Sequence, residues 1–397
     1  MLDGVDAGPF VDPAGLVAFW QREYLEGYVG AGGGTVKWLR GREGSGKTRV
    51  LRATLERAAG LGYLTATADA GTGALGRFDD LYREMMAQIP LDALAHSVAR
   101  TAAAQVGAAA WQPSQGLSVE AYLRSAGRPA SVVQDDVARC LDFLFASPNL
   151  DPPVAAAARR LAMPYVADGE AARGIAAVAA QWLRGQRLRA SERRQSGIYL
   201  ALDRYSARDV LRSLLHLLQM VGMPGMVWAV DRVEAVLVRR GAFAAGADAD
   251  ASRAPAPPGV PYTAQRRLDA YEGIREFIDE GGRLPGLMIV YAGRPEVFDD
   301  ERAGLVTYPA LAMRVQTEIE ADLVNLYNDV QDLDRLWQAD WPRHEAALVE
   351  AYGANGAARG ADLAGVLSGS AVSPVRRLVE RLAELGAASA EGVADGA

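Results

Sequence analysis

A glycine-rich segment followed by a lysine and a threonine is the part of this sequence best suited to chemistry. Residues 41–48 have the sequence G-R-E-G-S-G-K-T, which fits the phosphate-binding pattern G-x-x-x-x-G-K-[ST]. The glycines let the backbone curl so that successive N–H groups point at a phosphate, and the positive end of a following helix adds attraction. In this pattern Lys47 reaches the β- and γ-phosphates, and the Thr48 hydroxyl helps to hold Mg²⁺.

We therefore expect ATP and Mg²⁺ as ligands. The residues expected to form the nucleotide cradle are Gly41, Arg42, Glu43, Gly44, Ser45, Gly46, Lys47, Thr48 and Arg49. Val36, Trp38 and Leu39 predict a short buried strand before this segment, and apolar residues over 50–58 recur at helical spacing after it. A glycine-rich turn that merely begins an ordinary helix is the alternative, and the strand–loop–helix context argues against it.

A second chemical feature is the apolar run over 223–230, which ends in Asp231. Such a run predicts a strand that is buried on both faces of a parallel sheet, as in the Walker B motif of ATPases. Asp231 would then hold Mg²⁺ through water, opposite Thr48. The next residue is Arg232, where most such ATPases have a glutamate that orients the attacking water. A guanidinium does not deprotonate in proteins. Either Glu234 or another acid therefore serves as the base, or ATP hydrolysis is slow or absent.

Three later arginines are candidates for contacts with phosphate. Arg294 follows a predicted strand over 284–293, at the position where AAA+-type ATPases have a polar sensor of the γ-phosphate. Arg314 follows a short helical segment and is a candidate arginine finger for a neighbour's nucleotide, with an ordinary surface arginine as the equal alternative. Arg376 lies in the first turn of a helix that Ser373 caps and Pro374 begins, in the position of a second sensor.

The composition limits the class of protein. The chain has 397 residues, is 50% hydrophobic and carries a formal net charge of −7, which excludes a wholly basic protein that coats nucleic acid. A local basic patch is not excluded, because five arginines lie between residues 184 and 194, at 184, 187, 189, 193 and 194. These arginines form either a solvated helix face and loop or a contact for DNA phosphates or an acidic partner.

Other features point away from disulfide, metal-cluster and membrane proteins. The single cysteine, Cys140, allows neither an internal disulfide nor a cysteine-based zinc cluster, and the three histidines lack ligand spacing. No signal peptide opens the sequence, and no segment is long and apolar enough to span a membrane. We therefore expect a cytoplasmic protein without membrane contacts.

The order of predicted strands and helices predicts an α/β fold with a parallel sheet, a P-loop NTPase of the AAA+-like type. Aromatic residues at helical spacing over 16–28 predict a helix that serves either as core or as the adenine-side wall, and residues 241–259 predict a mobile loop.

We divide the chain into six parts. They are a helical lead-in (1–34), the P-loop half of the nucleotide-binding domain (35–90), a helical insertion (91–220), the Walker B and sensor half (221–316), a helical lid (317–387) and a disordered tail (388–397).

Five segments together resemble one known family. They are Gly41–Thr48, Trp182–Gln186, Gly225–Glu234, Tyr291–Pro295 and Tyr308–Arg314. In order and spacing they look like the BREX-system ATP-binding proteins, the BrxD-like AAA+/STAND-type family of bacterial phage-resistance loci, over about residues 30–385. The resemblance implies an ATP-driven accessory protein that acts on DNA alongside other defence-system proteins. The chain departs from the family at Arg232, where Glu is usual, and at Arg294, where Thr is usual.

Three functions are open on the sequence alone. The first is an ATPase of a DNA-directed phage-defence complex that contacts double-stranded DNA and forms homo-oligomers, because Arg314 must serve a neighbour. The second is a hydrolysis-deficient, ATP-gated switch or scaffold that docks a protein partner, which Arg232 and Arg294 suggest. The third is a small-molecule kinase, which the predicted helical lid and the late arginines disfavour.

Overall fold

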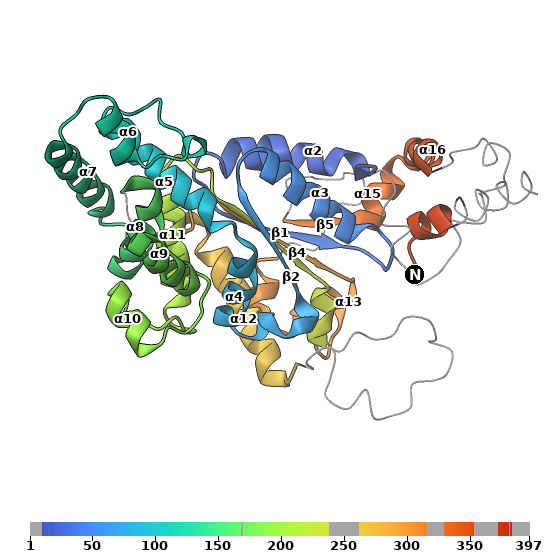
Figure 1. Cartoon of the computed structure of the whole chain (residues 1–397). Coiled ribbons are helices and arrows are strands. Elements are labelled where there is room, and N and C mark those ends of the chain that lie inside the picture. The colour runs from blue at the N-terminus through green and yellow to red at the C-terminus, as the bar shows by residue number, and fades with distance from the viewer. Residues whose placement is uncertain are drawn as a thin grey trace, which may run out of the picture.

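A five-stranded parallel sheet lies at the centre of the computed structural model, which describes residues 10–167, 170–237, 262–315, 329–352, 372–380 and 382. The strands are β1 Thr35–Arg40, β2 Leu64–Asp69, β3 Met226–Asp231, β4 Leu287–Gly293 and β5 Val330–Asp332. Their order is β2-β3-β4-β1-β5, and every described strand pair is parallel (Figure 1). The predicted α/β class is therefore confirmed, and β4 separates the strand before the glycine-rich loop from the strand that ends in Asp231.

Both faces of the sheet are covered by helices. On one face α2 (Leu16–Trp20) and α3 (Lys47–Gly60) form a core with one set of alternating strand residues, such as Val227 in β3. On the other face α4 (Phe78–Gln88) and α12 (Ala264–Asp279) pack with the opposite set, such as Trp228 (Figure 1). Successive residues of a strand point to opposite faces, so burial on both faces explains the continuous apolar runs in the sequence.

Helices alone fill the described chain between α4 and β3, apart from short turns. They gather at the end of the sheet away from α15 and α16 (Figure 1). They are α5 Leu91–Gln105, α6 Val119–Ser125, α7 Ala130–Phe145, α8 Pro152–Val166, α9 Glu170–Leu183, α10 Ala190–Ser196 and α11 Ala207–Met220. Helices α5, α8 and α9 pack closely because fully buried alanines such as Ala99, Ala158 and Ala179 let their backbones approach.

Two sequence predictions differ from the structure. Within the predicted helical lid, residues 330–332 form strand β5, which pairs with β1 at the edge of the sheet. The sequence at these positions, V-Q-D, has one apolar residue and no alternation, so its pattern gave no strand signal. The lead-in helix is likewise not one α-helix, because α2 continues as the π-helix η2 (Gln21–Tyr28). The predicted loop at 241–259 and the tail at 388–397 lie outside the described residues.

Among the described residues, the remaining helical elements are four α-helices, one further helical segment and several 3₁₀ turns. The remaining α-helices are α13 Glu296–Asp299, α14 Pro309–Ala312, α15 Leu333–Ala339 and α16 Trp341–Tyr352, and residues 374–380 are also helical. The 3₁₀ turns are η1 Pro13–Gly15, η3 Ala70–Thr72, η4 Ala74–Gly76, η5 Pro113–Gln115, η6 Val233–Leu237, η7 Gly281–Arg283 and η8 Leu305–Thr307.

A close backbone crossing precedes β3 and β4. Gly225 has a φ of +133°, and a Cβ placed on it would lie 2.0 Å from the carbonyl oxygen of Gly286. The nearby Gly222 also has a positive φ, +74°, but nothing lies within 4 Å of the place where its Cβ would be. Only glycine fits at position 225, because backbone atoms cannot move aside as a flexible side chain can.

We predict that Gly225→Ala destabilises the fold by about 4 kcal/mol or more, because it adds a backbone clash to the conformational strain. Gly222→Ala is the matched control and should cost about 1 to 2 kcal/mol, from strain alone. Urea unfolding of both variants measures the difference, and equal losses would contradict the prediction.

Candidate nucleotide-binding site

The glycine-rich loop connects β1 to α3 and is shaped by left-handed backbone. Gly44 and Gly46 have φ values of +75° and +90°, and Gly46 is the residue that precedes α3. Lys47 begins α3 and turns back over the loop, where its Nζ donates to the carbonyl oxygens of Gly41 (2.7 Å) and Arg42 (2.9 Å). Burial lowers the pKa of Lys47, and the carboxylates of Glu234 and Asp231 oppose that shift.

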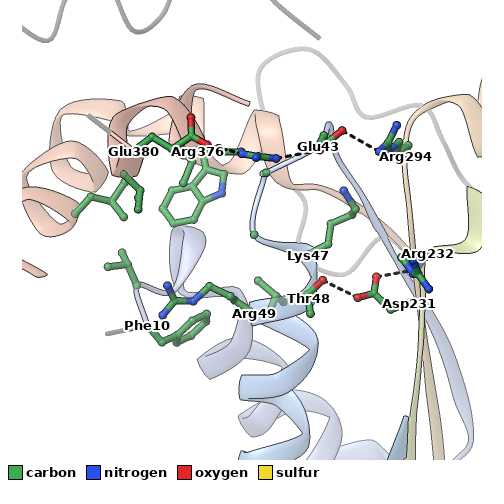
Figure 2. Close-up of a pocket in the computed structure, with 18 of the residues that line it drawn as sticks. Phe10, Glu43, Lys47, Thr48, Arg49, Asp231, Arg232, Arg294, Arg376 and Glu380 are labelled. Carbon is green, nitrogen blue, oxygen red and sulfur yellow. Dashed lines mark hydrogen bonds and ion pairs between the residues drawn. The ribbon is translucent and has the colours of Figure 1, made fainter. Parts of the chain in front are cut away.

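Thr48 and Asp231 meet across the site. The Thr48 hydroxyl donates to Oδ2 of Asp231 at 2.6 Å, although 183 residues separate them (Figure 2). A hydroxyl and a carboxylate oxygen are the kind of ligands that Mg²⁺ takes, so this pair fits the expected metal. Among the described residues no group of three or more His, Cys, Asp or Glu side chains could hold a metal ion, so phosphate and water oxygens would have to complete its coordination.

Arg232 lines this side of the site, and its guanidinium group is paired at the end of β2. Its backbone is in the left-handed region (φ +56°), and its Nε donates to Oδ1 of Asp69 at 2.9 Å, while Nη2 pairs with Oδ2 of the same carboxylate. Asp69 is the last residue of β2 and lies opposite Asp231 in the β2–β3 register. The two arginines that suggest an ATP-gated switch, Arg232 and Arg294, are therefore not equivalent, because Asp69 pairs with Arg232 on the β2 side.

Glu234 lies on the other side of β3, in the first turn of η6. It lines the same cavity as Lys47 and Asp231. Its carboxylate accepts from the backbone N–H of Arg294 at 3.3 Å and lies 3.5 Å from Arg294 Nε. The structure thus places a carboxylate beside the loop, although the residue directly after Asp231 is an arginine.

Arg294 and Arg376 meet at Glu43 of the loop. Arg294 Nη2 lies 2.9 Å from Oε2 of Glu43, and Arg376 Nη1 lies 2.9 Å from Oε1 (Figure 2). The side-chain cap predicted for Ser373 is not present, since its Oγ is buried and has no partner among the described residues. Its backbone N–H donates instead to the carbonyl oxygen of Glu43 at 2.9 Å.

A cavity of about 530 Å³ lies over the loop, a suitable size for a nucleotide. Its polar side contains most of the predicted site residues, together with Arg232 and Glu380. The predicted residues are Glu43, Gly44, Gly46, Lys47, Thr48, Arg49, Asp231, Glu234, Arg294 and Arg376. Its apolar side was missed from the sequence, because its members come from separate segments without a shared pattern. They are Phe10, Val11, Trp337, Leu348, Val375 and Val379. The lead-in therefore reaches the cavity through Phe10 and Val11, while its helical aromatics Phe19 and Trp20 are buried in the core.

Two side chains of helix α15 form hydrogen bonds with the backbone of the glycine-rich loop. Trp337 donates its indole N–H to the carbonyl oxygen of Ser45 at 2.9 Å. Asp334 accepts from the backbone N–H of Arg42 at 2.7 Å and lies 3.3 Å from Arg42 Nε. The loop conformation therefore depends on a helix that follows it by about 290 residues, as the sequence separation of 292 in both bonds shows.

Arg314 lies apart from this cavity. It pairs with Asp279 at the end of α12 and lines a small hollow with Gly34 and Thr35, at the start of β1. The glycine-rich loop follows the other end of that strand. Within this chain Arg314 thus serves no part of the nucleotide site, and its role toward a neighbouring molecule stays a prediction.

A parallel α/β sheet with a glycine-rich loop between its first strand and α3 is the architecture of a P-loop-type nucleotide-binding protein. The family model described as BREX system ATP-binding protein BrxC/D matches residues 23–109, 129–240 and 261–361, more than half of the chain. The chain belongs to this family, as its sequence motifs indicated. No curated protein and no solved structure gives a significant match. In the described part of the chain no helix is long and apolar enough to cross a membrane.

Trp337→Phe tests whether α15 sets the shape of the loop. We expect a loss of about 1 kcal/mol in the free energy of unfolding, because a buried carbonyl loses its donor, together with weaker ATP binding. Trp341→Phe, in α16, is the control, since it leaves the bond to Ser45 intact. Chemical unfolding and calorimetric titration measure the two effects. Unchanged ATP affinity in Trp337→Phe would show that the loop keeps its shape without this bond.

Proposed function

We propose that the protein is an AAA+-like ATPase that acts in a DNA-directed phage-defence complex. The observation that carries the proposal is the direct contact between Thr48 and Asp231, with Lys47 and Glu234 lining the same cavity. The family description supports ATP as the nucleotide. The cavity has a polar side for phosphates and an apolar side, with Trp337 and Phe10, for the base.

Each polar residue has a distinct role in this proposal. The loop N–H groups and Lys47 bind the phosphates, and Thr48 and Asp231 hold Mg²⁺, which neutralises developing phosphate charge when bound. Glu234 orients and deprotonates the attacking water, in place of the glutamate that Arg232 replaces. Arg294 and Arg376 contact the terminal phosphate, as two sensors on opposite sides of the loop.

The alternative is an ATP-gated switch or scaffold without turnover, which Arg232 and Arg294 suggest. Arg232 lines the cavity, but Asp69 engages its guanidinium group in a bidentate pair, and Glu234 supplies a carboxylate for hydrolysis in the same cavity. We therefore favour the ATPase.

Glu234→Gln should lower ATP turnover about a hundredfold or more while ATP affinity changes less than threefold, since glutamine keeps the size and an oxygen for the Arg294 N–H but cannot take a proton from water. Steady-state hydrolysis and binding of a non-hydrolysable ATP analogue measure the two quantities. Glu296 is an exposed acid in α13, and Glu296→Gln is therefore the matched control. Lys47→Ala should abolish binding of the ATP analogue. Normal turnover in Glu234→Gln would remove Glu234 as the base, and no turnover in the unaltered protein would favour the switch.

Assembly is also part of the proposal. We infer a homo-oligomer in which Arg314 of one molecule serves the nucleotide of the next, as an arginine finger does. Its pair with Asp279 would have to open on assembly. The exposed neighbour Met313, 84% accessible, gives this region an apolar contact for another molecule.

We propose that DNA is contacted by the helical insertion, residues 91–220, through the segment around α10. Four exposed arginines there, at 187, 189, 193 and 194, make no ion pair with any carboxylate that the structure describes. Tyr199 and Tyr205 follow and are 65% and 72% exposed. Guanidinium groups without a carboxylate partner can bind phosphates, and exposed aromatic rings add surface for the sugar or base.

The double variant Arg193→Glu/Arg194→Glu should weaken binding to double-stranded DNA about tenfold or more and reduce its dependence on salt, because two phosphate contacts become repulsive. Arg283→Glu/Arg302→Glu makes the same charge change at exposed arginines elsewhere and is the control. Fluorescence anisotropy at two salt concentrations measures both. Equal weakening in the two double variants would assign the effect to net charge and contradict a local contact.

A further inference from the structure

The carboxylate of Glu43 is divided between two arginines that come from opposite sides of the loop. One oxygen takes Arg294 at 2.9 Å, and the other takes Arg376 at 2.9 Å (Figure 2). All three residues line the cavity, and their side chains are 43%, 43% and 30% exposed for Glu43, Arg294 and Arg376. An ion pair so open to solvent adds little to stability, so the bridge matters chiefly for what enters the cavity.

Each arginine also has a second carboxylate that lies outside the loop. Arg294 Nε lies 3.5 Å from Glu234, and Arg376 Nε lies 2.8 Å from Glu380, one turn later in the same helical segment. These contacts hold the two guanidinium groups in place without help from Glu43. Glu43 is therefore the member of the cluster that another anion can replace.

The backbone fixes Glu43 at this position. Its carbonyl oxygen accepts from the N–H of Ser373, and residue 43 forms an isolated parallel bridge with Val372. A Cβ on the adjacent Gly44 would lie 2.4 Å from Cβ of Arg376, so the loop and the segment 372–376 are in direct contact. The Glu43 side chain can rotate away while its backbone stays in place.

We propose that Glu43 determines nucleotide specificity by competing with the terminal phosphate of ATP for Arg294 and Arg376. A terminal phosphate offers three oxygens and more negative charge than a carboxylate, so it replaces Glu43 on the guanidinium groups. ADP lacks this group and leaves the bridge closed. Glu43 therefore reduces the preference of the site for ATP over ADP. This inference rests on the ATP site proposed above.

Glu43→Gln tests the competition, because glutamine keeps the size and loses the charge. Affinity for a non-hydrolysable ATP analogue should rise about tenfold, while affinity for ADP should change by no more than about twofold. Isothermal titration with each nucleotide gives the ratio. Glu380→Gln is the matched control: it takes a carboxylate from the same arginine without touching the loop, and it should not raise the ratio. In the double variant Glu43→Gln/Arg376→Ala most of the gain should disappear.

Two outcomes overturn the inference alone. An unchanged ATP-to-ADP ratio in Glu43→Gln shows that no competition takes place. A fall in ATP affinity shows that Glu43 instead braces the arginines for the phosphate. If the unaltered protein shows no ATP binding that depends on Lys47, the proposed function fails as well, and that result is separate from the first two.

Discussion

Parallel pairing of the strands is the constraint on which the rest of this structure depends. It puts the carboxyl ends of β1, β3 and β4 at one edge of the sheet, so that three short segments meet there. The glycine-rich loop follows β1, Asp231 ends β3, and Arg294 follows β4. Residues far apart in the sequence thus meet at one cavity, as the 251-residue separation between Glu43 and Arg294 illustrates.

The loop is not rigid by its own sequence, since glycines give it freedom rather than order. Its shape comes from contacts with the chain that follows the last strand. Trp337 and Asp334 of α15 bind its backbone, and Ser373 binds the carbonyl oxygen of Glu43. Strand β5 places α15 beside the loop by pairing with β1. The carboxyl-terminal region is therefore as much a part of the nucleotide site as the motif itself.

This arrangement explains what the sequence could and could not predict. Local patterns sufficed for the loop and for Asp231, because a phosphate motif and an apolar run that ends in an acid need no tertiary information. Arg294 and Arg376 are predicted from the order of elements in AAA+-type ATPases, and the structure brings them together around Glu43. Strand β5 could not be predicted, since a three-residue edge strand has too short a pattern. The apolar side of the cavity could not be predicted either, because single residues such as Phe10 and Leu348 meet only in the folded chain.

Arg232 is a residue whose interpretation changes between the sequence and the structure. On the sequence alone, Arg232 stands where most such ATPases have the catalytic glutamate. In the fold β3 lies between β2 and β4. Directly after β3 the backbone of Arg232 is left-handed, and the side chains of Arg232 and Glu234 lie on different sides of that strand. The guanidinium turns toward Asp69 at the end of β2, while Glu234 reaches the β4 side and the cavity. The pair with Asp69 neutralises the arginine beside the Asp231 carboxylate. The cavity thus keeps a carboxylate beside the loop, that of Glu234, although an arginine directly follows Asp231.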